Sequence, residues 1–152
     1  MKALGRDIKA ETYSAYALAS TAVTAGGTGD DVEIVGSTLD RLALPKAESV
    51  VFEIPCKAIL AATKTLVVTG KIQDSANGSD WTDLVASGTL LTLTGGAGGS
   101  TEYGVARLGV DLSQARRYVH VCATPNLSAT ATDTAEIGAG IGELGGLQEQ
   151  PQ

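Results

Sequence analysis

The sequence predicts an all-β fold, an antiparallel two-sheet β-sandwich with an extended N-terminal arm. Three observations predict it. Apolar residues recur with a period of two, the 3.6-residue period of amphipathic helices is nearly absent, and clusters of Gly, Pro, Asn and Ser separate short apolar segments. About eight or nine short strands without a long helix favour two stacked sheets.

Small residues dominate the composition. Ala, Gly and Thr make up 58 of the 152 residues, whereas Leu, Ile, Val and Phe together supply 36, and aromatic residues are 4% of the chain. The share of large aliphatic residues stays above the floor of roughly 20% below which chains are usually disordered. We therefore expect one domain with a lean core.

The charge balance excludes several classes of protein. The net charge is −6, with 11 basic and 17 acidic residues, which opposes nucleic-acid binding because phosphates are held by clustered Lys and Arg. The longest uncharged stretches, 12–29 and 84–101, are interrupted by Gly, Ser and Thr, so we expect no membrane span. No secretory signal is recognisable at the N-terminus, so we expect synthesis in a cytoplasm.

The clearest hairpin runs from residue 65 to residue 85. Apolar residues alternate along 65–73, a turn-rich segment follows at 74–80, and the returning strand occupies 81–85. The turn contains the pair Asn77-Gly78, which readily adopts positive φ. We expect these two strands to be neighbours in one sheet.

The remaining strands are bounded by turn-forming residues. Their expected ranges are 19–24, 31–37, 48–54, 88–93, 103–111, 116–123 and 132–143. The glycine-rich stretch 93–101 is expected to be a loop. Residues 7–19 contain good helix formers, yet Tyr13 and Tyr16 suit an extended arm that holds one short helix. The resulting domains are an N-terminal arm at 1–24, a sandwich at 25–144 and a C-terminal tail at 145–152.

Nucleophilic catalysis would have to use His120, the single histidine. Alternation along the strand places His120 and Cys122 on one face and Val119 and Val121 on the other. Side chains two residues apart on a strand lie about 7 Å apart, which is too far for a hydrogen bond. We therefore predict a structural or interface histidine, no catalytic residue and no enzymatic activity.

The sequence contains partial matches to metal and cofactor motifs, but each match lacks a residue or a sequence context that the motif requires. One histidine and two distant cysteines do not form a zinc site, and the calcium-like turn at 73–78 starts with Gln73 where an aspartate belongs. The match to G-x-G-x-x-G at 140–145 opens no helix before the sequence ends. We predict no cofactor and no metal. Cys56 and Cys122 are interpreted as two small buried residues, with a disulfide as the alternative.

Two adjacent arginines precede one of the predicted strands. Because side chains alternate along a strand, either Arg116 or Arg117 must point away from the core. Arginine is enriched at protein interfaces, so an intersubunit salt bridge is one interpretation and plain solvation is the other.

The order of these features resembles a known family. The resemblance runs over roughly residues 32–144 and rests on Gly36 and on the segments 49–52, 70–81, 107–112, 115–121 and 135–144. This pattern is similar to the small β-sandwich structural proteins encoded in the head-gene region of tailed bacteriophages, several of which are capsid decoration or cement proteins.

Membership of that family would imply a jelly-roll-like sandwich on the outer surface of a virion capsid. Its partners would be the major capsid protein, whose neighbouring subunits it bridges, and further copies of itself, with a trimer favoured over a dimer. Residues 1–20 are expected to clamp a capsid or sister subunit. The alternatives are a tail or neck component of the virion and a carbohydrate-binding module, for which Trp81 and four tyrosines are a poor aromatic supply.

Overall fold

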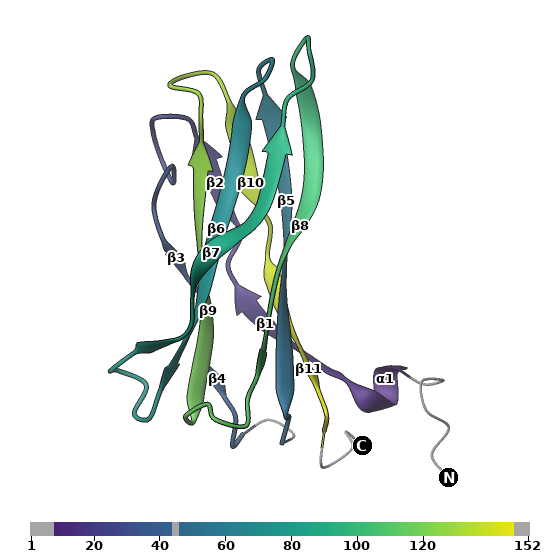
Figure 1. Ribbon diagram of the computed structural model, residues 1–152, viewed down its shortest axis with the longest axis vertical. Helices are drawn as coiled ribbons and strands as arrows, with labels where there is room; N and C mark the ends of the chain where they lie inside the picture. The colour runs from purple at the N-terminus through teal and green to yellow at the C-terminus, as the bar shows by residue number, and fades with distance from the viewer. Residues whose placement is uncertain (1–7, 44–45, 148–152) are drawn as a thin grey trace.

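The computed structural model describes residues 8–43 and 46–147 as one short helix and a set of antiparallel strands (Figure 1). The elements are α1 (Ile8–Glu11), β1 (Tyr13–Leu18), β2 (Thr21–Thr24), β3 (Ile34–Val35), β4 (Leu39–Asp40), β5 (Ser49–Leu60), β6 (Thr65–Ser75), β7 (Thr82–Thr94), β8 (Ser100–Asp111), β9 (Tyr118–Leu127), β10 (Thr134–Ile137) and β11 (Gly140–Gly145). The predicted all-β sandwich is confirmed.

The first sheet, sheet A, contains four lines, where a line is either one long strand or two consecutive strands that continue each other. β5 pairs with β8 along one side and with β10 and β11 along the other, and β10 and β11 in turn pair with β2 and β1. β1 and β2 thus form one interrupted line over residues 13–24, and β10 and β11 form another over 134–145. The order across sheet A is 13–24, 134–145, 49–60, 100–111.

The second sheet, sheet B, is built the same way. β9 pairs with β6 on one side and with the two short strands β3 and β4 on the other, and β6 pairs with β7. Numbering the lines of both sheets by chain order gives 1-8-3-6 for sheet A and 2-7-4-5 for sheet B. This is the strand order of the jelly roll, in which two Greek keys fold over each other.

Part of the predicted arm belongs to the sandwich. Residues 13–24 form β1 and β2 at the edge of sheet A, and Leu18 and Val23 are buried in the core, which fixes this stretch in the sheet. α1 lies beside the end of β1, outside the two sheets (Figure 1). Residues 1–7 of the predicted arm and 148–152 of the predicted tail lie outside the described residues.

Three other boundaries differ from the prediction. The expected strands 81–85 and 88–93 are one strand, β7, which follows β6 with shifts in register rather than a second turn. The loop expected at 93–101 narrows to the tip between β7 and β8. The expected strand 132–143 is divided into β10 and β11, because the pairing with β5 shifts by one residue between Ile137 and Ile141.

That interruption accommodates a proline inside a central strand. Pro55 of β5 has no N–H to donate, and its carbonyl accepts a hydrogen bond of 2.7 Å from the N–H of Gly138, at the break between β10 and β11. A Cβ on residue 138 would lie 2.9 Å from both Cγ and O of Pro55. Glycine at 138 and proline at 55 therefore fit each other across the break.

The core lies between the two sheets and is lined by alternate residues of each long strand. Phe52, the single phenylalanine, is fully buried at its centre, along with Ile54 of β5 and Leu66 and Ile72 of β6. Most other buried residues are Val, Leu or Ala. The core is lean, as the composition predicts, because it contains few large side chains between two sheets of mostly small residues.

Candidate interaction surface

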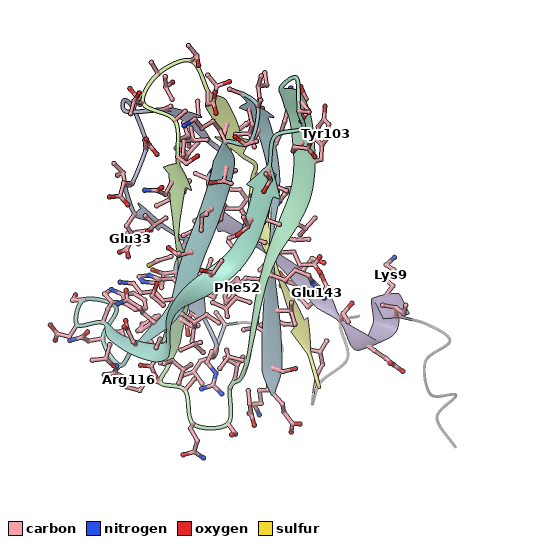
Figure 2. All side chains as sticks on the ribbon, turned by 45° about the horizontal axis from the view of Figure 1, so that its top comes forward. Lys9, Glu33, Phe52, Tyr103, Arg116 and Glu143 are labelled. Atoms are coloured by element: carbon pink, nitrogen blue, oxygen red, sulfur yellow. The ribbon has the colours of Figure 1, made fainter. Side chains whose placement is uncertain are left out.

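The outer face of sheet A carries exposed apolar residues from four strands. They are Tyr16, Pro55, Ile59, Tyr103, Val105 and Ile141, hereafter the outer apolar band. Tyr103 is 70% exposed and Tyr16 is 56% exposed. Figure 2 shows Tyr103 at the periphery of the molecule, on the β8 side. Large apolar side chains exposed together on one sheet face mark interaction surfaces more often than scattered ones do.

Strand register makes this band continuous. Tyr16 is paired with Ile141, and Pro55 is paired with Val105. Tyr103 lies two residues from Val105 on β8, and Ile59 lies four residues from Pro55 on β5, diagonal to Tyr103 on the same face. Opposite residues on one face are about 5 Å apart and diagonal neighbours about 7–8 Å, so the six side chains form one strip across sheet A.

Charged residues flank the band. Glu53 lies between Ile141 and Arg107 in the same row, and its carboxylate accepts from Nε of Arg107 at 2.8 Å. Lys57 is paired with both Tyr103 and Glu136, at one wall of a shallow groove of about 380 Å³ that Ile59 also lines. An apolar strip with a polar border is the usual anatomy of a protein–protein interface.

His120 and Cys122 share one face of β9, as the alternation predicts, and because Val119 and Val121 face the core, that shared face is the outer one of sheet B. Gln73 of β6 stands between them: its Oε1 is 3.1 Å from Nε2 of His120 and 3.7 Å from Sγ of Cys122. Nε2 of Gln73 donates to Asp83 at 2.8 Å, and because a carboxylate only accepts, this contact fixes the orientation of the amide. His120 therefore donates through Nε2–H to a neutral carbonyl.

The electrostatics of this cluster oppose nucleophilic chemistry. Burial raises the pKa of the Cys122 thiol to about 11, and the Glu33 carboxylate adds to the increase. Burial also lowers the pKa of His120, which keeps the imidazole neutral near pH 7. A reactive thiolate–imidazolium pair needs shifts in the opposite directions.

Trp81, on which a carbohydrate-binding function would depend, stacks against His120. The ring centroids are 3.8 Å apart and the planes are inclined by 19°. The turn that carries Trp81 is held by its own side chains: Oδ1 of Asn77 accepts from the N–H groups of Ser79 and Asp80, each at 2.9 Å, and Gly78 has a φ of 77°. The predicted hairpin turn is confirmed.

Both arginines before β9 are engaged within the chain. Arg116 donates from its Nε and Nη2 to Oδ1 of buried Asp74, at 2.9 and 2.6 Å. Arg117 donates from Nε and Nη2 to the two carboxylate oxygens of Asp40, at 3.0 and 2.7 Å. Plain solvation is therefore wrong for this pair, whose contacts tie β6 and β4 to the start of β9, and the intersubunit salt bridge stays a prediction.

Cys56 and Cys122 are free thiols. Cys56 points into the core from sheet A, whereas Cys122 faces outward from sheet B beside His120, so the two side chains are directed to different layers. The interpretation as two small buried residues is confirmed. Burial raises the pKa of the Cys56 thiol to about 11 as well.

Within residues 8–43 and 46–147, no three metal-ligating side chains of the His, Cys, Asp and Glu types come together. The same part of the chain contains no helix of the length and hydropathy needed to cross a membrane.

Comparison with known proteins finds likeness in fold alone. No family model matches the chain, and neither does any curated protein. In the structure of infectious bursal disease virus strain Gx, a chain superposes with a TM-score of 0.50 at 11% identity, over 91% of this chain and 34% of the viral chain. This chain thus spans about a third of the length of that protein. The likeness shows a shared β-sandwich fold with a chain of that virus structure.

Two other solved structures superpose with lower TM-scores. The PBSX exported protein XepA superposes with a TM-score of 0.40 at 17% identity, over 92% of this chain and 39% of XepA. A crystal structure of Clostridium thermocellum xylanase 10B, containing its CBM22-1 and GH10 modules, gives a TM-score of 0.37 at 9% identity, over 88% of this chain and 26% of that one.

Sequence reasoning missed the outer apolar band. Its strongest signal lies in β8, where Tyr103 and Val105 alternate in phase with Arg107, and apolar residues that share a face with a charged residue face solvent. The contribution of Tyr16 could not be found in this way, because the residues around it were expected to form an arm.

Proposed function

We propose that this protein is a non-enzymatic structural component of a virus particle, which decorates the outer surface of a phage capsid and bridges major capsid subunits. The observation that carries the proposal is the outer apolar band. It is an extended, exposed surface across four paired strands, suited to another protein and too open to enclose a small substrate.

The fold and the chemistry of the cysteines support this proposal. The jelly-roll strand order is used by viral capsid domains, and the superposition on a viral particle chain is consistent with that use. Cys56 and Cys122 are poor nucleophiles because burial raises the pKa of each thiol to about 11. A capsid lattice would present many copies of one site, so each contact need only be modest.

Co-sedimentation with purified heads of the phage that encodes the chain tests the proposal. Ile141→Ser changes the band on β11, away from the free edge of β8, and we expect it to weaken binding to heads at least about tenfold. Val32→Ser is the matched control, since Val32 is 55% exposed outside the band. Wild-type protein that stays in the supernatant, or equal binding by both variants, would refute the proposal.

The expected clamp at residues 1–20 is tested by a shorter deletion. Removing all 20 residues would delete β1, whose Leu18 is fully buried, and would unfold the sandwich rather than test an arm. Deleting residues 1–12 leaves β1 intact. We propose that this deletion also weakens co-sedimentation, and undiminished binding would show that these residues do not contribute.

The location of the protein on the virus particle distinguishes a head component from a tail component. Gold-labelled antibody viewed by negative-stain microscopy is expected to mark the head surface. Labelling restricted to the neck or tail would replace the decoration role with that of a tail component, which is the alternative consistent with the same fold.

A further inference from the structure

β8 forms an edge of sheet A that lacks the usual protection against pairing. Its twelve residues pair with β5 without a break in register, from Ser100 opposite Leu60 to Asp111 opposite Ser49. Within the described residues, β5 is the only strand that pairs with it. Natural sheets usually shorten, bulge or cover such edges, because their free N–H and C=O groups otherwise recruit another strand.

The other three edges of the sandwich are irregular. The 13–24 line is interrupted between β1 and β2 and shifts register after Tyr16. β3 and β4 contain two residues each, and β7 shifts register at three places along β6. Over the described residues, β8 is the edge that combines length with regular register.

The direction of the free hydrogen-bonding groups follows from Pro55. Its carbonyl accepts from Gly138 on the β10 side of β5, so the Pro55–Val105 pair exchanges no hydrogen bonds, and the N–H and C=O of Val105 point away from β5. Alternation extends this to the other odd-numbered residues of β8. These residues also carry the exposed side chains, including Tyr103 and Arg107.

We propose that β8 pairs antiparallel with β8 of a second copy of this chain, about a two-fold axis at Val105. An antiparallel pair must place outward-pointing residues opposite each other, and this register does so along the whole edge. Val105 faces Val105 of the second copy, and Tyr103 faces Arg107 of the second copy. The inference goes beyond the proposed function, which names no contact between copies of this chain, and it assigns such a contact to the β8 edge.

Side-chain chemistry supports this register. A guanidinium opposite a tyrosine ring forms a favourable cation–π contact, and the two-fold axis forms it twice. No like charges oppose each other: Glu102 faces Leu108 of the second copy, and Asp111 lies beyond the paired segment. The interface is isologous and closed, as in most homodimers.

The consequence is a sheet that continues through both molecules. The outer apolar band reaches Val105 and Tyr103 at the β8 edge, so pairing joins the bands of the two copies into one surface. A dimer would present two linked copies of the band to a lattice, which raises its effective affinity without new contacts.

Analytical ultracentrifugation of the full chain tests the proposal. We expect the wild type to sediment as a dimer and Val105→Lys to raise the dimer dissociation constant at least about tenfold, because two like charges would face each other at the axis. Val35→Lys is the matched control: Val35 is 58% exposed on β3. Circular dichroism should be unchanged in both variants, since both side chains face solvent.

Oxidative cross-linking tests the register. Opposite residues of a hydrogen-bonded antiparallel pair have Cα atoms about 5.5 Å apart, within disulfide range, so Val105→Cys should form a covalent dimer. Tyr103→Cys should not, because residue 103 does not face itself. The native thiols are buried and do not compete.

Four results would overturn the inference: a wild-type monomer at all concentrations, a trimer, a dimer that Val105→Lys leaves intact, or cross-linking of Tyr103→Cys as fast as Val105→Cys. The capsid role is judged separately, by co-sedimentation. A dimer broken by Val105→Lys that never binds heads would remove the proposed virion role and leave the β8 interface standing.

Discussion

Replacing Gly142 with alanine tests whether the core depends on a glycine facing Phe52. The two residues are paired across β11 and β5, and a Cβ on residue 142 would lie 3.1 Å from Cε1 and 3.3 Å from Cδ1 of Phe52. Gly142 is not among the residues with positive φ, so alanine adds no backbone strain. Alanine also reduces the entropy of the unfolded chain, which favours folding by about 0.4–1 kcal/mol.

Packing decides the sign of the effect. Phe52 is fully buried, so its ring cannot yield without displacing other core side chains, and Cγ2 of Val50 lies only 3.4 Å from the new methyl group. Overpacking of this kind costs about 1–3 kcal/mol. After the entropic gain is subtracted, the midpoints of the two ranges give a loss of about 1.3 kcal/mol in the free energy of unfolding for Gly142→Ala.

A double-mutant cycle makes the argument specific. Phe52→Leu alone should cost about 1–3 kcal/mol through lost burial. In the double variant the shorter side chain makes room for the methyl group, so the combined loss should be smaller than the sum by at least about 1 kcal/mol. This favourable coupling would not arise if the two residues acted independently.

Urea denaturation followed by the fluorescence of Trp81, the single tryptophan, measures each free energy of unfolding. Gly88→Ala is the control: a Cβ there meets nothing within 4 Å, so it should leave stability unchanged or raise it by up to about 1 kcal/mol. If Gly142→Ala is as stable as Gly88→Ala, or if the effects of the double variant add, the packing argument is refuted.

Three further predictions follow from other sites. Burial lowers the pKa of His120, so the unfolded chain takes up a proton first; stability should fall as pH drops below about 6.5, and His120→Gln should flatten this dependence in denaturation at pH 7.5 and 5. For Asp74, burial raises the pKa, but hydrogen bonds and charge from Arg116 outweigh burial and lower the pKa overall. The contribution of Asp74 to the free energy of unfolding is therefore present above about pH 4 and lost on acidification. Asp74→Asn should cost about 1.5–3 kcal/mol of stability at neutral pH and little in acid. Gly36→Ala would place a Cβ 2.4 Å from the carbonyl oxygen of Val121 and should cost more than about 3 kcal/mol, whereas a soluble variant with an unchanged melting temperature would contradict this.

Period-two alternation predicted the sandwich because most long strands are buried on one face. Along β6, Leu66, Val68 and Ile72 face the core, and this pattern located the β6–β7 hairpin and its turn correctly. The same rule correctly placed His120 and Cys122 on one face of β9 and Val119 and Val121 on the other. Where one face of a strand is apolar and the other polar, sequence alone was sufficient.

Prediction failed where the alternating residues are small or the partner is distant. In β1 the small Ala17 and the adjacent Leu18 are both buried, so the stretch does not alternate clearly and the edge of sheet A was expected to be an arm. The partners of Arg116 and Arg117 lie 42 and 77 residues away in the sequence, and only the sheet register brings them together. The outer apolar band depends on that same register across four strands.

The jelly roll explains how the high content of small residues contributes to packing of the core. On β11, Gly140 and Gly142 lie over Ile54 and Phe52 of β5, where any Cβ would approach those side chains to within about 3 Å. Large residues of one strand therefore occupy the volume that glycine leaves on the next. The few large side chains are enough to fill the core because the glycines are distributed opposite them, and a substitution that enlarges β11 should be suppressed by one that shortens β5. Composition gives only the number of small and large residues, whereas the packing of the core depends on which of them are paired across β5 and β11.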